Sequence, residues 1–498
     1  MLVKQNRLII ILFSIAFLCL YSCKNSDKTA LKTKEAYNAI VANSSPRDLP
    51  EIKEEGVLRA LVVYSSTSYF LYKGQPMGFE YEMLQRLAKD LNLKLEIIVS
   101  DDLDSQFEVL NSGEVDIIAH GMTITNQRKW EVDFTDYLYL TKQVLVQKKP
   151  DNFRKLSWST LQKHLIDDPL DLIGDTVSIR KNSSYYERIV SLSNEMGGEI
   201  HINYLDSKLS TGEIIDMVAE GKIKYTIADE NLARINAASN PILKVDVPIS
   251  FSQRIAWVIR KKSVKFKEEV NKWIRKQRKK TSYFVIYNKY FKNKRFYRRR
   301  VKSDYYSLNN NQISQYDDLI KRFTKKLGWD WRLLAAQVYQ ESKFDPSAES
   351  WAGARGLMQV MPATAKELGI KDVSDPIESL RGGTTYLNIL YNRFEDIEDD
   401  ETRIKFTLAS FNCGYEHVRD AQRLADFNNL DPTVWENNVA EMLLELHFPK
   451  NYNKDFIKYG YVRGTEPVNY VRQIFERYHQ YKQFITDEEE DKLEFTSK

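Results

Sequence analysis

One glutamate in the C-terminal half could move a proton in catalysis. Glu341 lies near the end of a predicted helix that starts at Asp330, a favourable capping residue, and runs to Ser342. Leu334 and Val338 precede it at helical spacing, so its carboxyl should lie at the end of an apolar face. Burial raises the pKa of a carboxyl, and an acid still protonated near neutral pH can donate a proton to a glycosidic oxygen. A solvated glutamate at a helix end is the plain alternative.

Four motifs in this half decide between the two interpretations. They are Gln340–Ser342, Gly353–Pro362, Leu408–Gly414 and Tyr459–Glu466 with Tyr470–Val471 just after it. In this order and spacing they resemble the catalytic domain of the soluble-type lytic transglycosylases. That resemblance implies an all-α, lysozyme-like fold, and the helical pattern from Ile313 to Tyr481 agrees with it.

The resemblance also implies a role for each matching residue. Glu341 would be the catalytic acid and base, Ser342 would orient its carboxyl, and Tyr470 would lie opposite it. Asn412 would hydrogen-bond near the N-acetyl group of the sugar. The full set of residues expected to bind the substrate is Ser342, Gly356, Met358, Gln359, Asn412, Glu466 and Tyr470.

Some of these residues have a structural alternative. Packing in a core would also explain Met358 and Tyr470, and a loop or helix cap would explain Asn412. The chain departs from the family at Phe411, where a Tyr is usual, so one hydroxyl is missing. Cys413 is interpreted as a packing residue, because no His is placed beside it in the motif.

The motifs supply one assured carboxyl, whereas hydrolysing glycosidases commonly use two. In the family the acid protonates the oxygen between N-acetylmuramic acid and N-acetylglucosamine. The carboxylate then takes the proton of the muramyl C6 hydroxyl, which attacks C1 and leaves a 1,6-anhydro end. We therefore expect a carbon–oxygen lyase that cleaves peptidoglycan strands in cell wall remodelling. A hydrolytic muramidase and a non-catalytic, wall-tethered receptor stay open as alternatives.

The N-terminal half carries a different pattern. Short apolar runs alternate with helical periods from Gly56 to Ile259, which predicts two α/β lobes, the first with a mostly parallel sheet, and a cleft between them. The motif Gly121–Arg128, followed by Val132–Tyr137, resembles the bacterial extracellular solute-binding proteins of the amino-acid type. The order of the two domains resembles the membrane-bound members of the lytic murein transglycosylases.

The solute-binding resemblance implies four ligand-binding residues. Arg128 would hold an α-carboxylate, Asp229 would accept from an α-amino group, and Thr123 and Ser183 would add hydroxyls. A surface ion pair is the alternative for Arg128, and a helix cap is the alternative for Asp229. The ligand would be an amino acid, a peptide or a muropeptide, and a cleft that binds nothing also stays open.

The first residues predict a secretory signal and a lipidation site. Lys4 and Arg7 precede the apolar run Leu8–Leu20, which is too short to span a bilayer and is typical of a secretory signal. The run ends before Cys23 in a pattern that resembles a bacterial lipobox. We expect Cys23 to be lipidated and to anchor the chain, most simply to the outer membrane facing the periplasm.

Charge is unevenly distributed along the 498 residues. The formal net charge is 73 − 69 = +4, yet Arg275 to Lys302 contain 13 Lys or Arg and no Asp or Glu. A solvated helix with a basic linker is the plain interpretation, attraction to anionic lipid or wall polymers is the second, and nucleic acid is not expected as a partner. Three Cys exclude a disulfide scaffold, and no metal site or cofactor is expected.

These patterns predict a fixed order of segments. They are a signal peptide (1–22), a tether (23–50), a solute-binding domain (51–292, second lobe about 148–246), a basic linker (293–312), a lysozyme-like domain (313–482) and an acidic tail (483–498).

Overall fold

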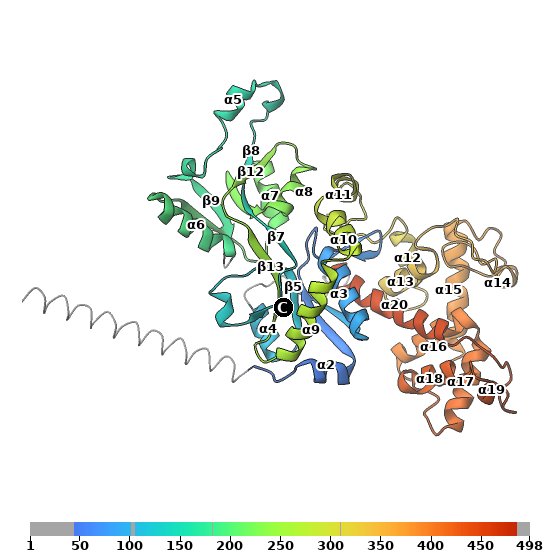
Figure 1. The fold of residues 1–498 in the computed structure, drawn as a ribbon. Coiled ribbons are helices and arrows are strands. Elements are labelled where there is room, and N and C mark those ends of the chain that lie inside the picture. Colours follow the sequence, from blue (N-terminus) through green and yellow to red (C-terminus); the bar gives the residue numbers. More distant parts are fainter. Residues whose placement is uncertain (1–43, 101–104, 182, 309, 486–498) are drawn as a thin grey trace, which may run out of the picture. The chain divides into compact units, whose positions relative to one another are not determined.

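The computed structural model describes residues 44–100, 105–181, 183–308 and 310–485 (Figure 1). The predicted signal peptide, Cys23 and most of the tether and of the acidic tail lie outside the described residues. Contacts divide the chain into two compact units. The α/β unit comprises the described part of Met1–Phe70 together with Met77–Val301, and the helical unit comprises Leu71–Pro76 and the described part of Lys302–Lys498.

The first lobe of the α/β unit is built on a sheet with the order β4-β1-β5-β13-β6, in which β7 also pairs with β13. β1 is parallel to β4 and β5, as expected, whereas β13 runs antiparallel to β5, β6 and β7. The chain therefore returns to the first lobe through an antiparallel strand. The strands are β1 Val57–Val62, β4 Lys94–Val99, β5 Ile117–Thr123, β6 Asp133–Phe134, β7 Tyr139–Thr141 and β13 Gln253–Ile259.

Helices of the first lobe follow the predicted periods. Met83, Leu84 and Leu87 of α3 are buried, and Asn92 ends that helix in the left-handed conformation. Leu61, Leu110 and Ile118 belong to the core of the lobe. The helices before the second lobe are α2 Leu49–Glu55, α3 Phe79–Leu91, α4 Gln106–Ser112 and the 3₁₀ turn η1 Arg128–Trp130.

The second lobe has two small sheets. β8 lies between β11 and β12 and is antiparallel to both, and β9 is parallel to β10. Apolar side chains of α6 and of these strands share a core. The strands are β8 Gln143–Lys148, β9 Thr176–Arg180, β10 His201–Leu205, β11 Tyr225–Asp229 and β12 Leu243–Pro248. The helices are η2 Phe153–Lys155, α5 Trp158–Gln162, η3 Pro169–Leu172, α6 Ser184–Met196, α7 Thr211–Glu220 and α8 Glu230–Ala237.

Three further helices follow β13 and complete the α/β unit. They are α9 Val264–Gln277, α10 Thr281–Phe291 and α11 Lys294–Val301. The sequence predicts a linker over 293–312, but α11 lies inside that range and belongs to this unit. The reason is that Tyr297 and Arg300 point inward and are buried, and the Tyr297 hydroxyl donates to Asn236.

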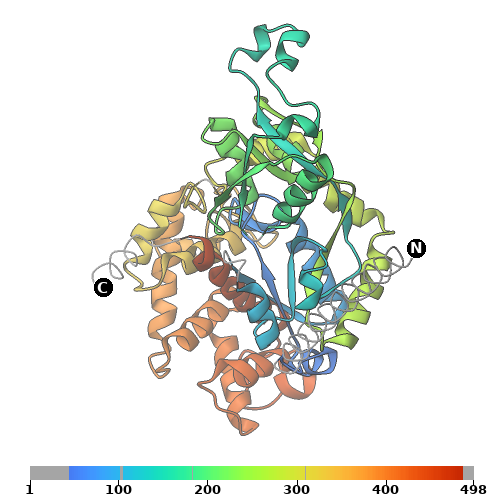
Figure 2. The same cartoon turned by 90° about the vertical axis from the view of Figure 1, so that its left-hand side faces the viewer.

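The helical unit agrees with the predicted all-α pattern (Figure 2). One continuous core joins its helices, with α13 packed on α20 and α20 packed on α16. Its helices are α12 Asp317–Thr324, α13 Trp331–Ser342, α14 Pro362–Glu367, α15 Pro376–Asn392, α16 Asp400–Cys413, α17 Tyr415–Phe427, η4 Trp435–Val439, α18 Ala440–Glu445, α19 Pro449–Tyr452 and α20 Thr465–Phe484. Among the described residues, no helix combines the length and the apolar composition that crossing a bilayer requires.

A short segment from far upstream completes the helical unit. Strands β2 Phe70–Tyr72 and β3 Gln75–Met77 form a hairpin, and Leu71 lies in the core of the helical unit. The Tyr481 hydroxyl donates to the Gly74 carbonyl oxygen over 2.7 Å. A side chain at position 74 would collide with that hydroxyl and with Phe344, so this tight approach requires glycine.

Candidate active site and solute pocket

Glu341 occupies the last turn of α13, where the sequence places it. The helix begins at Asp330, whose carboxylate accepts from the Arg332 backbone N–H over 2.8 Å. It ends at Lys343, which is in the left-handed conformation. Most residues of α13 are buried, so Glu341 reaches the end of a helix that is surrounded by core rather than by solvent.

A chain of hydrogen bonds leads to the Glu341 carboxyl. The Tyr470 hydroxyl donates to Glu341 Oε1, and the same hydroxyl accepts from Gln337 Nε2 over 3.1 Å. Gln337 lies one turn before Glu341 on α13 and is fully buried, and Tyr470 comes from α20. Because Gln337 Nε2 can only donate, the Tyr470 proton points to the carboxyl.

Burial raises the pKa of Glu341 to about 7, and the hydrogen bond from Tyr470 acts in the opposite direction by stabilising the carboxylate. The carboxyl is therefore a weak acid that is partly protonated near neutral pH. A group in this condition can give a proton in one step and take one back in the next.

The loop Gly353–Pro362 holds the end of α13. Ser342 Oγ donates to the Leu357 carbonyl oxygen over 2.9 Å, which ties the helix to this loop. Gly356 has φ +81°, and a Cβ there would stand 1.8 Å from the Val373 carbonyl oxygen. Gln359 Nε2 donates to the Ala348 and Gly356 carbonyl oxygens, so its amide closes the same loop.

Met358 takes a different position from the one that the resemblance implies. Its side chain is fully buried and would collide with any Cβ at Gly383 of α15. The structure thus places Met358 in the core, where it supports the loop, and not on the wall of a groove. Its backbone N–H is held by Ser379 Oγ over 3.2 Å.

Asn412 and Glu466 lie at helix ends. Asn412 is half-buried in the last turn of α16, and Glu466 is exposed in the first turn of α20. Cys413, beside Asn412, has its pKa raised to about 12, mainly by burial and also by the charge of Glu466. A thiol that stays protonated near neutral pH is a poor nucleophile.

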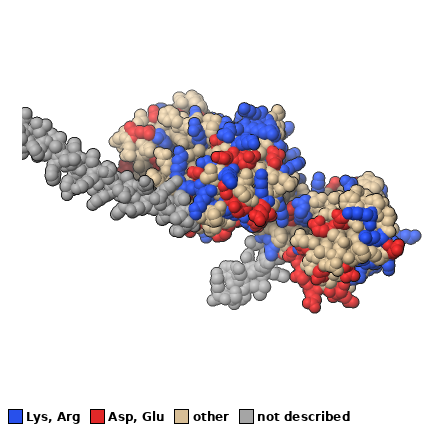
Figure 3. Space-filling model, turned by 60° about the horizontal axis from the view of Figure 1, so that its bottom comes forward, with Lys and Arg blue, Asp and Glu red and all other residues tan. Residues whose placement is uncertain are grey.

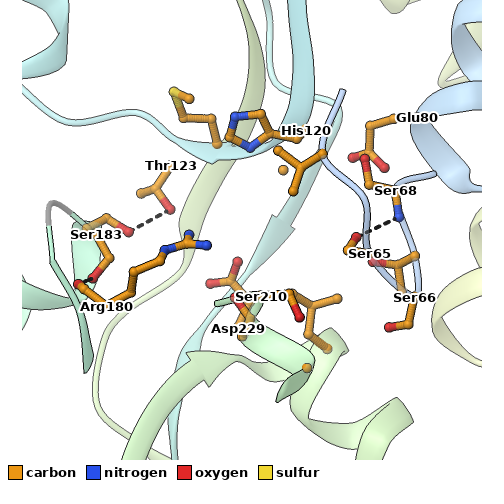
Figure 4. A pocket seen from close by; sticks show the side chains of 18 of the residues that line it. Ser65, Ser66, Ser68, Glu80, His120, Thr123, Arg180, Ser183, Ser210 and Asp229 are labelled. Atoms are coloured by element: carbon orange, nitrogen blue, oxygen red, sulfur yellow. Dashed lines mark hydrogen bonds between the residues drawn. The ribbon is translucent and has the colours of Figure 1, made fainter. Parts of the chain in front are cut away.

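The four predicted ligand residues of the α/β unit line one pocket. Thr123 ends β5, Ser183 precedes α6, Asp229 ends β11, and Arg128 starts η1. Arg128 Nη1 donates to the Thr123 carbonyl oxygen over 3.0 Å, and burial lowers the pKa of its guanidinium. Figure 4 shows Thr123 and Ser183 on one side of the pocket and Asp229 below them.

The described residues show neither the helix cap considered for Asp229 nor the surface ion pair considered for Arg128. The Asp229 side chain does not cap α8, and its Oδ1 is buried without a hydrogen-bond partner among the described residues. Burial raises the pKa of Asp229 to about 7. Asp133, one of the two carboxylates close to Arg128 in the sequence, pairs with Lys267 over 2.8 Å.

Sequence reasoning missed further polar residues of the pocket. Glu80 is buried with its pKa raised to about 8, and His120 is kept neutral because burial and neighbouring arginines lower its pKa to about 3. Arg180 and the segment Ser65–Ser68 complete the wall (Figure 4). Glu80 lies in the first turn of α3 and Arg180 is the last residue of β9, and only the packing of the two lobes brings them to one cavity.

Comparisons with known proteins assign both units. Residues 62–293 match the model of the bacterial extracellular solute-binding proteins, family 3, and residues 318–431 match the transglycosylase SLT domain. A membrane-bound lytic murein transglycosylase F of Desulfosudis oleivorans is 33% identical over 439 residues, which cover 88% of this chain and 93% of the relative. The protein of the same name from Shewanella sediminis is 33% identical over 429 residues, covering 86% and 85%.

The chain belongs to the membrane-bound lytic murein transglycosylase F family. Among solved structures, an ancestral amino-acid-binding protein that preceded cyclohexadienyl dehydratase is similar to 49% of this chain and to 98% of its own, at 26% identity and a TM-score of 0.40. The predicted fold class is confirmed: a two-lobed, periplasmic-binding-protein-like domain precedes a lysozyme-like helical domain. The protein is a lyase of the cell envelope that acts on peptidoglycan.

The loop around Gly356 offers a matched pair of substitutions. Gly356→Ala and Gly353→Ala both put a side chain at positive φ, which costs about 1 kcal/mol each. Only Gly356→Ala also drives a Cβ into a backbone carbonyl; at Gly353 the nearest atom is 3.9 Å away. We expect Gly356→Ala to lose about 3 kcal/mol more stability from overpacking, seen as a lower melting temperature. Equal melting temperatures for the two variants would contradict this role of the loop.

The hydrogen bond from Tyr470 should tune the pH profile. Tyr470→Phe removes a donor to the Glu341 carboxylate, so the pKa of Glu341 should rise. The alkaline limb of kcat/KM on peptidoglycan should move up by about 1 to 2 pH units, since a hydrogen bond to a charge contributes about 1.5–3 kcal/mol. Tyr452→Phe, elsewhere in the helical unit, should leave the limb in place. An alkaline limb that stays in place or moves to lower pH in Tyr470→Phe would contradict the role of Tyr470 as a donor to the Glu341 carboxylate.

Proposed function

We propose that Glu341 is the single acid and base of a lytic transglycosylase that leaves 1,6-anhydro-N-acetylmuramic acid ends. The observation that carries the proposal is the half-enclosed Glu341 carboxyl, with its raised pKa and one donor, Tyr470. The protonated carboxyl donates to the glycosidic oxygen between the two sugars as the C1–O bond breaks. The substrate acetamide stabilises C1, and Asn412 and Glu466 bind the sugars near it.

The second half of the reaction uses the carboxylate that the first half produced. It takes the proton of the muramyl C6 hydroxyl, whose oxygen forms the new bond to C1. The proton thus returns to Glu341, no water is consumed, and the enzyme is ready for another cycle. A pKa close to 7 suits this sequence, because neither protonation state is strongly favoured over the other.

Glu341→Gln tests the reaction directly. The amide cannot give or take the proton, so release of anhydro fragments from purified sacculi should fall by at least about a thousandfold, in line with loss of an acid–base group. Glu395→Gln, which neutralises an exposed carboxylate of the same unit, should act normally. Undiminished release by Glu341→Gln would overturn the proposal.

Product mass separates the lyase from its rivals. A wild-type product lighter by one water than the reducing sugar supports the transglycosylase, and reducing ends would mean a muramidase. Binding to sacculi without any release would mean a wall-tethered receptor.

Glu341→Gln must be folded for this comparison. Because the folded-state pKa is raised, ionisation of Glu341 costs stability as pH rises from about 4.5 to about 7, so the variant should melt no lower than wild type above that window.

We also propose that the α/β unit binds an amino acid or a wall-derived peptide and that this ligand regulates the enzyme. Arg128 and Thr123 hold the carboxylate, Asp229 accepts from the amino group, and Ser183 adds a hydroxyl. Support comes from the pocket that these residues share and from Asp229 Oδ1, which has no hydrogen-bond partner in the described part of the chain and which an ammonium would satisfy. The lipid anchor at Cys23 and a location on the outer membrane facing the periplasm belong to the same proposal.

Calorimetric titration tests the pocket. L-arginine, L-glutamate and a purified wall tetrapeptide are the probes, and at least one should bind the wild type. Asp229→Ala should weaken that binding by at least about a hundredfold, because it removes a buried charge partner. Lys129→Ala, next to Arg128 but exposed, should bind normally.

Regulation requires that the ligand favour one state of the enzyme. Turnover on sacculi should therefore differ with and without the probe that binds, and the difference should vanish in Asp229→Ala. No binding by any probe would contradict the pocket assignment, and equal turnover would contradict regulation.

A further inference from the structure

The basic segment identified in the sequence is a folded surface in the structure. α10 turns Tyr283, Ile286 and Tyr290 into the α/β unit, and the Tyr283 hydroxyl donates to the Leu138 carbonyl oxygen over 2.7 Å. Its outer side carries Thr281, Phe284, Val285, Asn288 and Lys292, all of them exposed. The segment therefore presents a fixed face and not a loose linker.

Part of its positive charge is used inside the α/β unit. Arg275 pairs with Asp136 over 3.0 Å, and Lys289 pairs with Glu82 over 2.6 Å. Arg300 is fully buried over the ring of Phe70. These contacts link α9, α10 and α11 to the rest of the unit, so each of these three cations is already paired or buried.

Seven further cations of the segment are exposed and have no acidic partner among the described residues. They are Lys276, Lys279, Lys280, Lys292, Lys294, Arg295 and Arg299. No Asp or Glu occurs between Arg275 and Lys302 to neutralise them. Figure 3 shows that Lys and Arg side chains gather densely in places on the surface of the molecule.

The arrangement of these cations is specific. Lys279 and Lys280 precede α10, and Lys292 and Arg295 follow its last turn, about 18 Å further on at 1.5 Å per residue. Between these two cationic groups the outer side of α10 exposes 51% of Phe284 and 61% of Val285. We call this surface, made of Lys279, Lys280, Phe284, Val285, Lys292 and Arg295, the α10 face.

We propose that the α10 face binds the surface of an anionic phospholipid membrane. Phosphate head groups complement the two cationic groups, and Phe284 with Val285 can enter the boundary between head groups and acyl chains. A wall polymer would satisfy the cations but offers nothing apolar to the aliphatic side chain of Val285. The α10 face would thus be a second attachment, independent of any acyl chain and of the catalytic groups.

Vesicle binding tests the proposal in the full chain carrying Cys23→Ala, so that an acyl anchor does not contribute. This parent protein, with its α10 face unchanged, should bind phosphatidylglycerol-containing vesicles at least tenfold more strongly than phosphatidylcholine vesicles. Added salt should remove most of this preference, because the Debye length falls to about 3 Å at 1 M. Equal binding to both vesicles would overturn the proposal.

Charge reversal locates the surface. The preference for phosphatidylglycerol vesicles should be abolished by a fourfold charge reversal, Lys279→Glu, Lys280→Glu, Lys292→Glu and Arg295→Glu. The vesicle binding that survives added salt should be reduced by the pair Phe284→Ser and Val285→Ser. The matched control reverses four exposed lysines of the same unit, Lys129, Lys155, Lys163 and Lys208. It should keep the preference within about twofold of the parent.

Two outcomes would contradict the assignment. Equal losses in the control and in the α10 variant would mean that only net charge matters. Retention of vesicle binding by the α10 variant, together with loss of binding to isolated sacculi, would assign the surface to the wall. Because the serine pair leaves every charge in place, its result stands even if the fourfold reversal fails to fold.

Discussion

The helical unit depends on one constraint, the partial enclosure of the Glu341 carboxyl at the junction of α13 and α20. A carboxyl removed from water must be protonated or must find a donor, and here the donor is Tyr470, itself held by Gln337. The pair can form only if the last turn of α13 stops at a defined place. Ser342, bonded to Leu357, and the left-handed Lys343 set that stop.

The loop that receives Ser342 is therefore as important as the helix. Gly356 brings the backbone against Val373, and Met358 fills the space beside Gly383. Neither residue has to touch a sugar to matter for the chemistry, because a shift of the loop would release the end of α13. Motif residues of a catalytic domain can thus act through packing, and Met358 is an instance.

The α/β unit meets the same physical problem in its pocket. Asp229 and Glu80 are carboxyls with raised pKa values, and Asp229 Oδ1 lacks a partner among the described residues. In the helical unit a fixed hydroxyl supplies the missing hydrogen bond. In the pocket, under the function proposed above, a bound ligand supplies the missing hydrogen bond to Asp229.

Local pattern in the sequence was sufficient to predict the succession of strands and helices along the chain and the raised pKa of Glu341. These properties follow from hydrophobic period and capping, which act over a few residues. The four residues that share the pocket were predicted instead from the resemblance of a motif to a known family. Contacts between distant residues were decided only in the tertiary structure. Gln337 and Tyr470 are 133 positions apart, and Tyr481 meets Gly74 across 407. The basic segment was likewise divided into buried anchors and an exposed face by packing, since a run of Lys and Arg does not itself say which side chains will turn inward.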